Sequence, residues 1–419
     1  MAAVMMVTAT DLYDHRRGTC RSRRGDDSGG TEQAGGSNQW NQKFLHGYSL
    51  LSDASPPVNV REGANVPGGF VFLNDPRHAG KRQAWEGDVA VNKQWIYARK
   101  PAAEVGPDNF DLVEGPMPEP KPGDVLVRTT LLSLDPASRA WMQGATYRSQ
   151  LNPGDVMAGW GLGEVVSSNA KGFEPGDLVS GEYGWQQYAS FSPKALTKHD
   201  KRHKPEHILG VLGITGLTAY FGMLDVGRPR PGETVLVSGA AGAVGSIAGQ
   251  IAKISGCRVI GTTRGADKCK WIVDELGFDA AIDYTAENLD KSLKDACPNG
   301  LDVYFDNTGG EVLAAALRRM NVFGRVSCCG AISQYNTSKP EPGPFGVPGF
   351  IVTKRIRMEG FVVMDFYNRK AQGEAALARW LEEGKLKAPV DVVEGFEKMP
   401  SALAGMFAGK NKGKLMVRV

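Results

Sequence analysis

The sequence predicts an α/β protein in which a doubly wound parallel sheet is joined to a β-rich unit. Three observations support this prediction. From about Gly213 onward, apolar runs alternate with helical patterns, which implies a parallel sheet with covered faces. The preceding part instead holds short strands divided by Pro-Gly-acid turns. Residues 234–245 read Thr-Val-Leu-Val-Ser-Gly-Ala-Ala-Gly-Ala-Val-Gly and then enter a small-residue helix, the strand–turn–helix pattern of a dinucleotide site.

Bulk composition indicates a globular protein. The 419 residues are 42% hydrophobic and 23% charged, with room for two ordinary domains. A net charge of +3, not concentrated in one tail, argues against an electrostatic nucleic-acid binder. No apolar window has the length that spans a bilayer. The 6 cysteines include no Cys-x-x-Cys pair, so we expect a reduced, cytoplasmic setting.

Residues 1–90 differ in texture from the rest. An Arg-rich stretch at residues 14–24 is followed by Gly, Ser, Asn and Gln without a repeat. Such a composition buries too little apolar surface to offset the entropy of ordering, so we expect a disordered extension. Organelle targeting is the alternative, which Asp11, Asp14, Asp26 and Asp27 make a poor fit.

Order is expected to begin near Asn92. The clearest strands of the β-rich unit are residues 125–131 and 161–166, between turns at 122–124, 153–155, 175–177 and 231–233. The parallel sheet is expected to contain strands 234–238, 258–262, 280–283, 302–306, 325–329 and 357–363. A helix over 371–383 and an edge strand over 414–419, which returns to the β-rich unit, complete the chain.

The residues after the second strand of the parallel sheet indicate which nicotinamide cofactor is used. A site for NAD places a carboxylate there, to bind the ribose 2′-hydroxyl. This chain has Arg264 and Lys268, which supply cationic donors for a 2′-phosphate. Asp267 is better explained as an N-cap or first-turn acid of the helix 268–276. The alternative is that the two cations are only solvated surface charges.

Two polar segments follow later strands of the sheet. Residues 306–310 read Asp-Asn-Thr-Gly-Gly, and residues 330–336 read Gly-Ala-Ile-Ser-Gln-Tyr-Asn. In an open parallel sheet, ligands lie beyond the carboxyl ends of the strands, so both segments are expected to meet the nicotinamide half of the cofactor. Ordinary turn chemistry is the alternative.

The sequence offers no metal site in the β-rich unit. Residues 92–198 contain no cysteine and no histidine, the ligands that catalytic zinc requires. His199, His203 and His207 have helical spacing, but Pro205 interrupts that helix and neighbouring lysines would repel a cation. Without a Lewis acid to ionise an alcohol, hydride transfer to an activated carbon–carbon double bond is the more natural chemistry. The enolate then needs only hydrogen-bond donors.

Taken together, these motifs resemble the zinc-independent medium-chain dehydrogenase/reductases, within the curcumin reductase and prostaglandin/alkenal reductase branch. The likeness extends over about residues 92–419. It rests on the glycine-rich turn, on Asp306–Gly310 and on further pieces: residues 134–136, 184–188, 213–220, 354–361 and 409–414.

The resemblance implies a GroES-like catalytic domain over 91–215, completed by 384–419, and a Rossmann domain over 216–383. It also implies a homodimer, NADPH as cofactor and an α,β-unsaturated ketone or aldehyde as substrate. The implied reaction reduces the carbon–carbon double bond of that substrate. By matching position, the pyrophosphate would be held by Gly242, Ala243, Val244 and Gly245. Lys268 would bind the 2′-phosphate, and Tyr284 and Asn307 would flank the adenosine and ribose side. The nicotinamide half would be wrapped by Cys329, Gly330, Ala331, Ile332, Ser333, Tyr335, Phe361, Val362 and Val363, with Asn411 closing over it.

Tyr147 and Tyr335 match the family's substrate-side tyrosines and are the catalytic candidates. The sequence departs from the family pattern at two places, so the proton donor stays open among the two tyrosines, the cofactor ribose and solvent. The family's Asp-Pro-Tyr-Met-Arg-Gly segment reads Asp-Pro-Ala-Ser-Arg-Ala at residues 135–140, and Thr353 stands where some plant relatives carry a tyrosine. Quinone reduction and cofactor binding without turnover are the alternative functions on the same fold.

Overall fold

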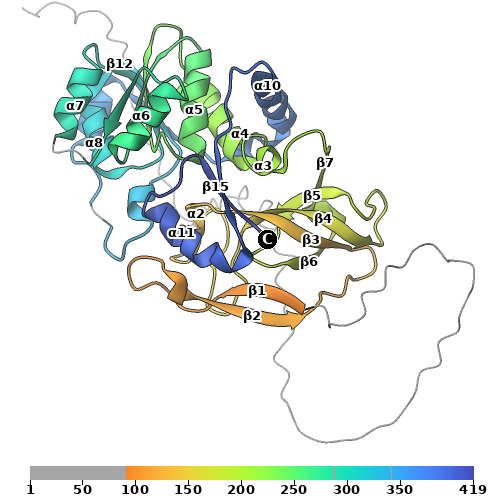
Figure 1. Cartoon of the computed structure of the whole chain (residues 1–419). Helices are drawn as coiled ribbons and strands as arrows, with labels where there is room; N and C mark the ends of the chain where they lie inside the picture. The colour runs from red at the N-terminus through yellow and green to blue at the C-terminus, as the bar shows by residue number, and fades with distance from the viewer. Residues whose placement is uncertain (1–90, 286–287, 341) are drawn as a thin grey trace, which may run out of the picture. The chain divides into compact units, whose positions relative to one another are not determined.

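The structure is a computed structural model that describes residues 91–285, 288–340 and 342–419. These residues lie within one compact unit, Ala84–Val419, which holds a β-rich part and a parallel α/β part (Figure 1). The expectations for residues 1–90 therefore lie outside the described residues. The predicted fold class is confirmed. The domain boundaries at 215 and 383 stay predictions.

The β-rich part is built on a seven-stranded sheet. Its strand order is β14-β15-β3-β4-β5-β7, with β6 paired to β3. A separate antiparallel pair joins β1 and β2. The strands are β1 Val91–Tyr97, β2 Phe110–Pro116, β3 Val125–Ser133, β4 Trp160–Ser168, β5 Leu178–Glu182, β6 Tyr188–Phe191, β7 Thr197–His199, β14 Val390–Glu394 and β15 Lys414–Arg418. Both strands predicted for this part are present and extend beyond their predicted ends.

The C-terminal strand returns to the β-rich sheet as predicted, but it is not an edge strand. β15 lies between β3, to which it runs antiparallel, and β14, to which it runs parallel. The edge prediction was wrong because β14 was not recognised as a strand. Figure 1 shows the blue β15 beside the much earlier β3, coloured orange.

The parallel part has a six-stranded sheet in the order β10-β9-β8-β11-β12-β13. Its strands are β8 Thr234–Ser238, β9 Arg258–Thr263, β10 Ala280–Asp283, β11 Leu301–Asp306, β12 Met320–Cys328 and β13 Arg357–Gly360. All six were predicted, although β13 is shorter than expected because the chain enters a 3-10 helix at Val363. The order reverses between β8 and β11, so a crevice for ligands is expected beyond their carboxyl ends.

Helices cover both faces of the parallel sheet. Val235 and Val237 pack on one face with residues of α4 and α5, whereas Leu236 packs on the other with residues of α7 and α8. This alternation follows from the two-residue period of a strand. The helices are α2 Ala137–Trp141, α3 Pro205–Leu209, α4 Ile214–Phe221, α5 Ala243–Ile254, α6 Ala266–Asp274, α7 Leu289–Ala296, α8 Gly310–Arg319, α9 Val347–Lys354, α10 Lys370–Glu382 and α11 Met399–Phe407.

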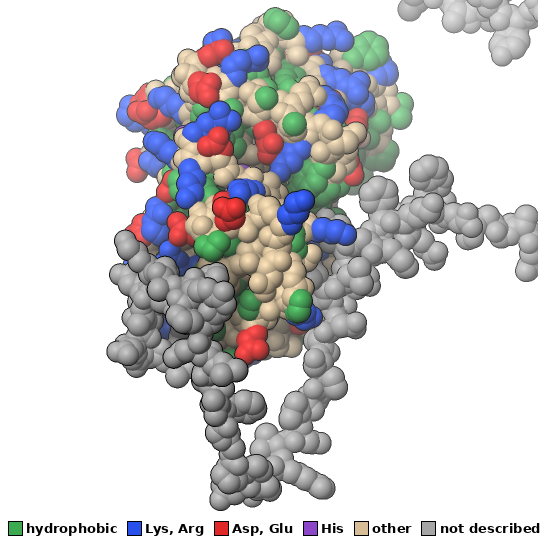
Figure 2. Space-filling view, turned by 90° about the vertical axis from the view of Figure 1, so that its right-hand side faces the viewer, with side chains coloured by type: hydrophobic (Ala, Val, Ile, Leu, Met, Phe, Trp, Pro, Cys, Tyr) green, Lys and Arg blue, Asp and Glu red, His purple; other side chains and the backbone are tan. Residues whose placement is uncertain are grey.

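Among the described helices, none is both long and apolar enough to cross a membrane. On the face drawn in Figure 2, basic and acidic side chains are interspersed with hydrophobic ones. The five described cysteines, at 257, 269, 297, 328 and 329, are free thiols.

Candidate functional site

The glycine-rich turn lies between β8 and α5, with Gly242 as the residue that caps the helix. The turn is closed by a hydrogen bond from the Gly242 amide to the Gly239 carbonyl, at 2.9 Å. A Cβ placed on Gly245 would lie 2.3 Å from that carbonyl oxygen, so the close backbone packing requires glycine. Ala243, Val244 and Gly245 form the first turn of α5, where amides lack carbonyl partners within the helix. Such a helix start attracts a phosphate group.

Residues 409–413, which we term the C-terminal segment, lie beside this turn. The Gly413 amide donates to the Ala241 carbonyl at 2.8 Å, and Gly413 forms a parallel bridge with Gly242. Within the segment, the Asn411 side-chain amide donates to the Gly413 carbonyl at 2.9 Å. The structure therefore brings Asn411 close to the glycine-rich turn.

Arg264 directly follows β9, and Lys268 lies near the start of α6. Arg264 is exposed, its Nε is 3.3 Å from the Tyr284 hydroxyl and its guanidinium carbon lies 5.9 Å from the centre of that ring. Lys268 Nζ donates to the carbonyls of Gly409 and Asn411, at 2.7 and 2.5 Å. Burial, followed by the nearby charges of Lys412 and Arg264, lowers the pKa of Lys268. Asp267 lies in the first turn of α6, as predicted.

The carboxyl ends of β8 and β11 are joined by Asp306, Asn307 and Ser238. The buried Asp306 Oδ1 accepts from the Tyr304 hydroxyl at 2.7 Å and from the backbone amides of residues 308 and 309, at 2.9 and 2.8 Å. Asn307 Nδ2 donates to the Ser238 carbonyl at 2.6 Å. Hydrogen bonds within the turn thus engage Asp306 Oδ1 and Asn307 Nδ2. Asp306 also forms part of the wall of a pocket.

That pocket has a volume of about 330 Å³ and lies beyond the ends of β11 and β12. Cys329, Gly330, Ala331 and Tyr335 line it together with Asp306. The Tyr335 hydroxyl accepts a hydrogen bond from the Ala331 amide at 3.0 Å, which leaves its own proton available for donation. Burial raises the pKa of Tyr335.

The other residues predicted to contact the nicotinamide half differ in their burial and in their hydrogen bonds. Ser333 Oγ donates to the Thr308 carbonyl at 2.6 Å, whereas Ile332 is half-buried. The Phe361 ring meets the Phe305 ring edge-on, with ring centroids 6.4 Å apart. Val362 is half-buried, and Val363 belongs to the hydrophobic core.

Burial also raises the pKa of the neighbouring thiols, Cys328 to about 11 and Cys329 to about 12. The charge of Asp306 acts on both thiols in the same direction.

Tyr147 lies against Trp141, with ring centroids 6.2 Å apart in an edge-on arrangement. The residue as a whole is 55% exposed, although its hydroxyl is partly shielded. Shielding of the hydroxyl from water raises the pKa of Tyr147 to about 12, and the neighbouring Asp135 and Tyr335 contribute in the same direction. The two catalytic candidates, one from each part of the fold, are therefore close enough to interact electrostatically.

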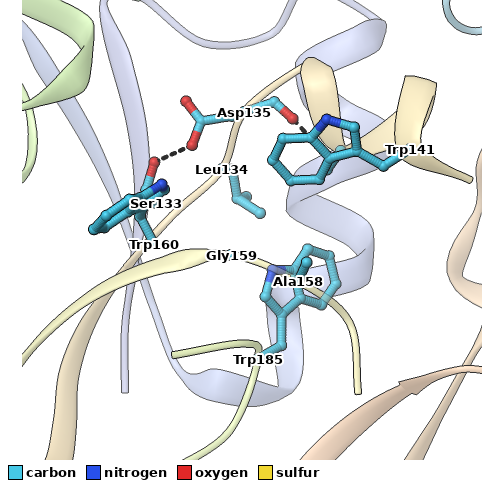
Figure 3. Close-up of a pocket in the computed structure, with 9 residues that line it drawn as sticks. Ser133, Leu134, Asp135, Trp141, Ala158, Gly159, Trp160 and Trp185 are labelled. Atoms are coloured by element: carbon cyan, nitrogen blue, oxygen red, sulfur yellow. Dashed lines mark hydrogen bonds between the residues drawn. The ribbon is translucent and has the colours of Figure 1, made fainter. Parts of the chain in front are cut away.

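Sequence reasoning did not assign a role to the ion pair between Asp135 and Lys414. Lys414 Nζ donates to Asp135 Oδ1 at 2.6 Å and to the Leu134 carbonyl at 2.8 Å, and its side chain is 3% exposed. Ser133 Oγ donates to the other Asp135 oxygen, as Figure 3 shows. A cavity of about 10 Å³, the space of roughly one water, lies beside this group and is bordered by Trp141, Trp160 and Trp185. Both residues lie in segments that carry the family resemblance, residues 134–136 and 409–414, which is the signal from which a role could have been predicted.

Two further residues attach the Tyr335 loop to the β-rich part. Gln143 Nε2 donates to the Tyr335 and Thr337 carbonyls, at 3.0 and 3.3 Å. Asn336 Oδ1 accepts from the Val105 amide at 2.7 Å. Neither contact has a signal in the sequence, because each joins residues separated by roughly two hundred positions.

The three histidines do not share a helix. His199 ends β7 and bonds to Ser180, with 2.7 Å between its Nε2 and the serine Oγ, while His207 lies on α3. Across the described residues, no three His, Cys, Asp or Glu side chains are grouped so as to hold a metal ion.

Two known protein families match this chain, one over the β-rich part and one over the parallel part. Residues 93–199 match the family described as the N-terminal domain of oxidoreductase, and residues 243–382 match the family described as zinc-binding dehydrogenase. These matches and the fold define a medium-chain dehydrogenase/reductase.

Individual relatives narrow the class. The chain is 44% identical over 336 residues to a putative NADP-dependent oxidoreductase, YfmJ, of Bacillus subtilis, covering 79% of this chain and 98% of the relative. It is 40% identical over 334 residues to the NADPH-dependent curcumin reductase of Escherichia coli, covering 78% and 97%. The crystal structure of CurA from Vibrio vulnificus in complex with NADPH superposes with a TM-score of 0.75 at 38% identity, covering 78% and 99%. The chain belongs to the zinc-independent branch that contains the curcumin and prostaglandin/alkenal reductases.

Replacement of Asp135 by Ala is expected to lower the free energy of unfolding by about 3 kcal/mol, because it leaves a buried ammonium without its carboxylate. The expected loss is smaller than the roughly 5 kcal/mol that breaking a fully buried ion pair can cost, because the Asp135 side chain is 36% exposed. Chemical denaturation measures the change. The double variant Asp135→Ala/Lys414→Met should recover part of the stability, since it removes the unpaired charge as well. A double variant no more stable than Asp135→Ala would contradict the assignment.

Proposed function

We propose that this chain reduces the carbon–carbon double bond of α,β-unsaturated ketones or aldehydes. It is an NADPH-dependent oxidoreductase of the zinc-independent branch. The observation that carries the proposal is the meeting of three features at one edge of the parallel sheet. These are the glycine-rich turn, the cations at the end of β9, and the pocket that contains Tyr335. The curcumin reductase relative, whose named substrate is an unsaturated ketone, supports the choice of substrate class.

The residues present fit NADPH. A Cβ at Gly245 would clash with the Gly239 carbonyl, so this glycine lets the helix pack closely on the turn. The amides of Ala243, Val244 and Gly245 lie in the first turn of α5, where a pyrophosphate would bind. Arg264 and Lys268 would hold the 2′-phosphate, with Tyr284 and Asn307 on the adenosine and ribose side. The nicotinamide half would lie against Cys329–Tyr335 and Phe361–Val363, with Asn411 closing over it.

The β-carbon of the substrate would receive a hydride from NADPH when the cofactor is bound. Negative charge then develops on the carbonyl oxygen, which requires a hydrogen-bond donor. Tyr335 fits this task, because its oxygen already accepts from the Ala331 amide and its proton is free to donate. The raised pKa of Tyr335 keeps the phenol protonated through neutral pH. Solvent or Tyr147, which is not among the residues that line the pocket, would deliver a proton to the α-carbon.

We also propose that two copies of the chain associate, in the cytoplasm. The large exposed apolar side chains include Val322 and Phe323 on β12, Phe345 before α9 and Val352 on α9. They belong to elements near β13, the edge strand of the parallel sheet. Large apolar side chains exposed on neighbouring elements commonly mark an interface with another protein chain. Light scattering should give twice the chain mass of 45.0 kDa. A species of the single-chain mass would contradict this proposal.

The function is tested by turnover with a panel of enones, enals and quinones, with identification of each product. We expect NADPH oxidation with enones and enals, saturation of their double bonds, and little oxidation with quinones. Turnover confined to quinones would overturn the proposal. Tight NADPH binding without turnover on any member of the panel would assign the chain to a binding role instead.

Replacing Tyr335 by Phe removes the proposed donor and keeps the ring. We expect kcat with an enone to fall by on the order of 10²-fold, with NADPH affinity nearly unchanged, because the lost hydrogen bond strengthens in the transition state. In the unchanged protein, this group should cause no loss of rate until the pH exceeds about 10, since its pKa is raised above the ordinary value of tyrosine. Full activity in Tyr335→Phe would transfer the donor role to Tyr147, the cofactor ribose or water.

A further inference from the structure

The C-terminal segment brings a cation of its own to the proposed phosphate site. Lys268 Nζ is bonded to the carbonyls of Gly409 and Asn411, so the segment is fixed against α6 at these two points. Arg264 is also adjacent, because a Cβ on Gly409 would lie 3.7 Å from its Cδ. The segment therefore runs between the two residues proposed to bind the 2′-phosphate.

Lys268 is only partly available for a ligand. An ammonium group has three N–H donors, and in Lys268 two of them are directed at backbone carbonyls. A phosphate at this place would compete for them or receive the third alone. Two of the three donors of Lys268 thus hold the C-terminal segment in place. A dianionic phosphate at this site would therefore need further cations to balance its charge.

Lys412 occupies the position from which such a cation would act. Its Nζ lies 5.8 Å from the centre of the Trp271 ring, one helical turn beyond Lys268 on α6. Its charge acts on Lys268, as does that of Arg264. Asp391 is the acid that acts on Lys268 in the opposite direction. Three cations, from the turn after β9, from α6 and from the C-terminal segment, therefore share one small region.

Lys410 belongs to the same segment but extends the other way. Its Cδ would lie 3.6 Å from a Cβ on Gly405, so the side chain runs back over α11. Lys410 and Lys412 are both exposed and two residues apart. They differ mainly in the helix that they cover, which makes Lys410 a control for the loss of one positive charge.

We propose that Lys412 is a specificity-determining residue, which binds the 2′-phosphate of NADPH together with Arg264 and the remaining donor of Lys268. The inference rests on the proposed cofactor site. In this arrangement Lys268 holds the C-terminal segment in place, and the segment supplies the charge. Preference for a 2′-phosphate then depends on a residue nearly 150 positions beyond the strand end where such preference is usually found.

The test is calorimetric binding of two probes, adenosine 2′,5′-bisphosphate and 5′-AMP, to the full chain and to the variants Lys412→Gln, Lys412→Arg and Lys410→Gln. The probes differ only in the 2′-phosphate. We expect Lys412→Gln to weaken binding of the bisphosphate roughly tenfold, as for loss of a charge-assisted hydrogen bond, and to leave 5′-AMP unchanged. Lys410→Gln should change neither, and Lys412→Arg should retain most of the preference.

The outcomes separate this inference from the function on which it rests. If the unchanged chain prefers the bisphosphate and Lys412→Gln behaves like Lys410→Gln, the role of Lys412 is overturned and the cofactor site stands. If the unchanged chain binds both probes equally, the proposed 2′-phosphate site fails, and this inference fails with it. Equal weakening of both probes in Lys412→Gln would show a structural role for Lys412 and would also overturn the proposal.

Discussion

The ion pair between Lys414 and Asp135 is the contact on which the arrangement of the candidate site depends. Lys414 begins the strand that brings the end of the chain back to the β-rich sheet, and Asp135 lies two residues after the end of β3. Fixing these two residues together fixes their neighbours in sequence. On one side the C-terminal segment is held beside the glycine-rich turn, and on the other side α2 is held where Gln143 reaches the Tyr335 loop. A buried ammonium tolerates few alternative positions for its carboxylate, so we expect the pair to fix this geometry.

Much of the parallel sheet could be predicted from the sequence, because its information is local. Each strand is a short apolar run flanked by turn residues, and β10 was predicted with the bounds that the structure has. The β-rich sheet was harder, because its order joins strands from both ends of the chain. β14 is only partly buried along its length and shows no clean alternation. Its omission made the C-terminal strand look like an edge.

The candidate site divides in the same way. The glycine-rich turn and the cations after β9 were visible because spacing along one strand–turn–helix unit carries them. The bonds from Lys268 to Gly409 and Asn411 were not visible, since they span 141 and 143 residues. At Asp306 and Asn307, the two interpretations offered by the sequence coexist. Their hydrogen bonds build the turn that joins β8 and β11. The same turn also forms a wall of the pocket.

The two adjacent thiols at the end of β12 have a consequence for the durability of such an enzyme. Unsaturated ketones and aldehydes are electrophiles that alkylate cysteine, and the attacking species is the thiolate. Cys328 and Cys329 line the pocket, yet burial and the charge of Asp306 keep both sulfurs protonated at neutral pH. The wall that would receive the reactive compound thus disfavours the thiolate form of both residues, which lowers their reactivity toward a soft electrophile held against them.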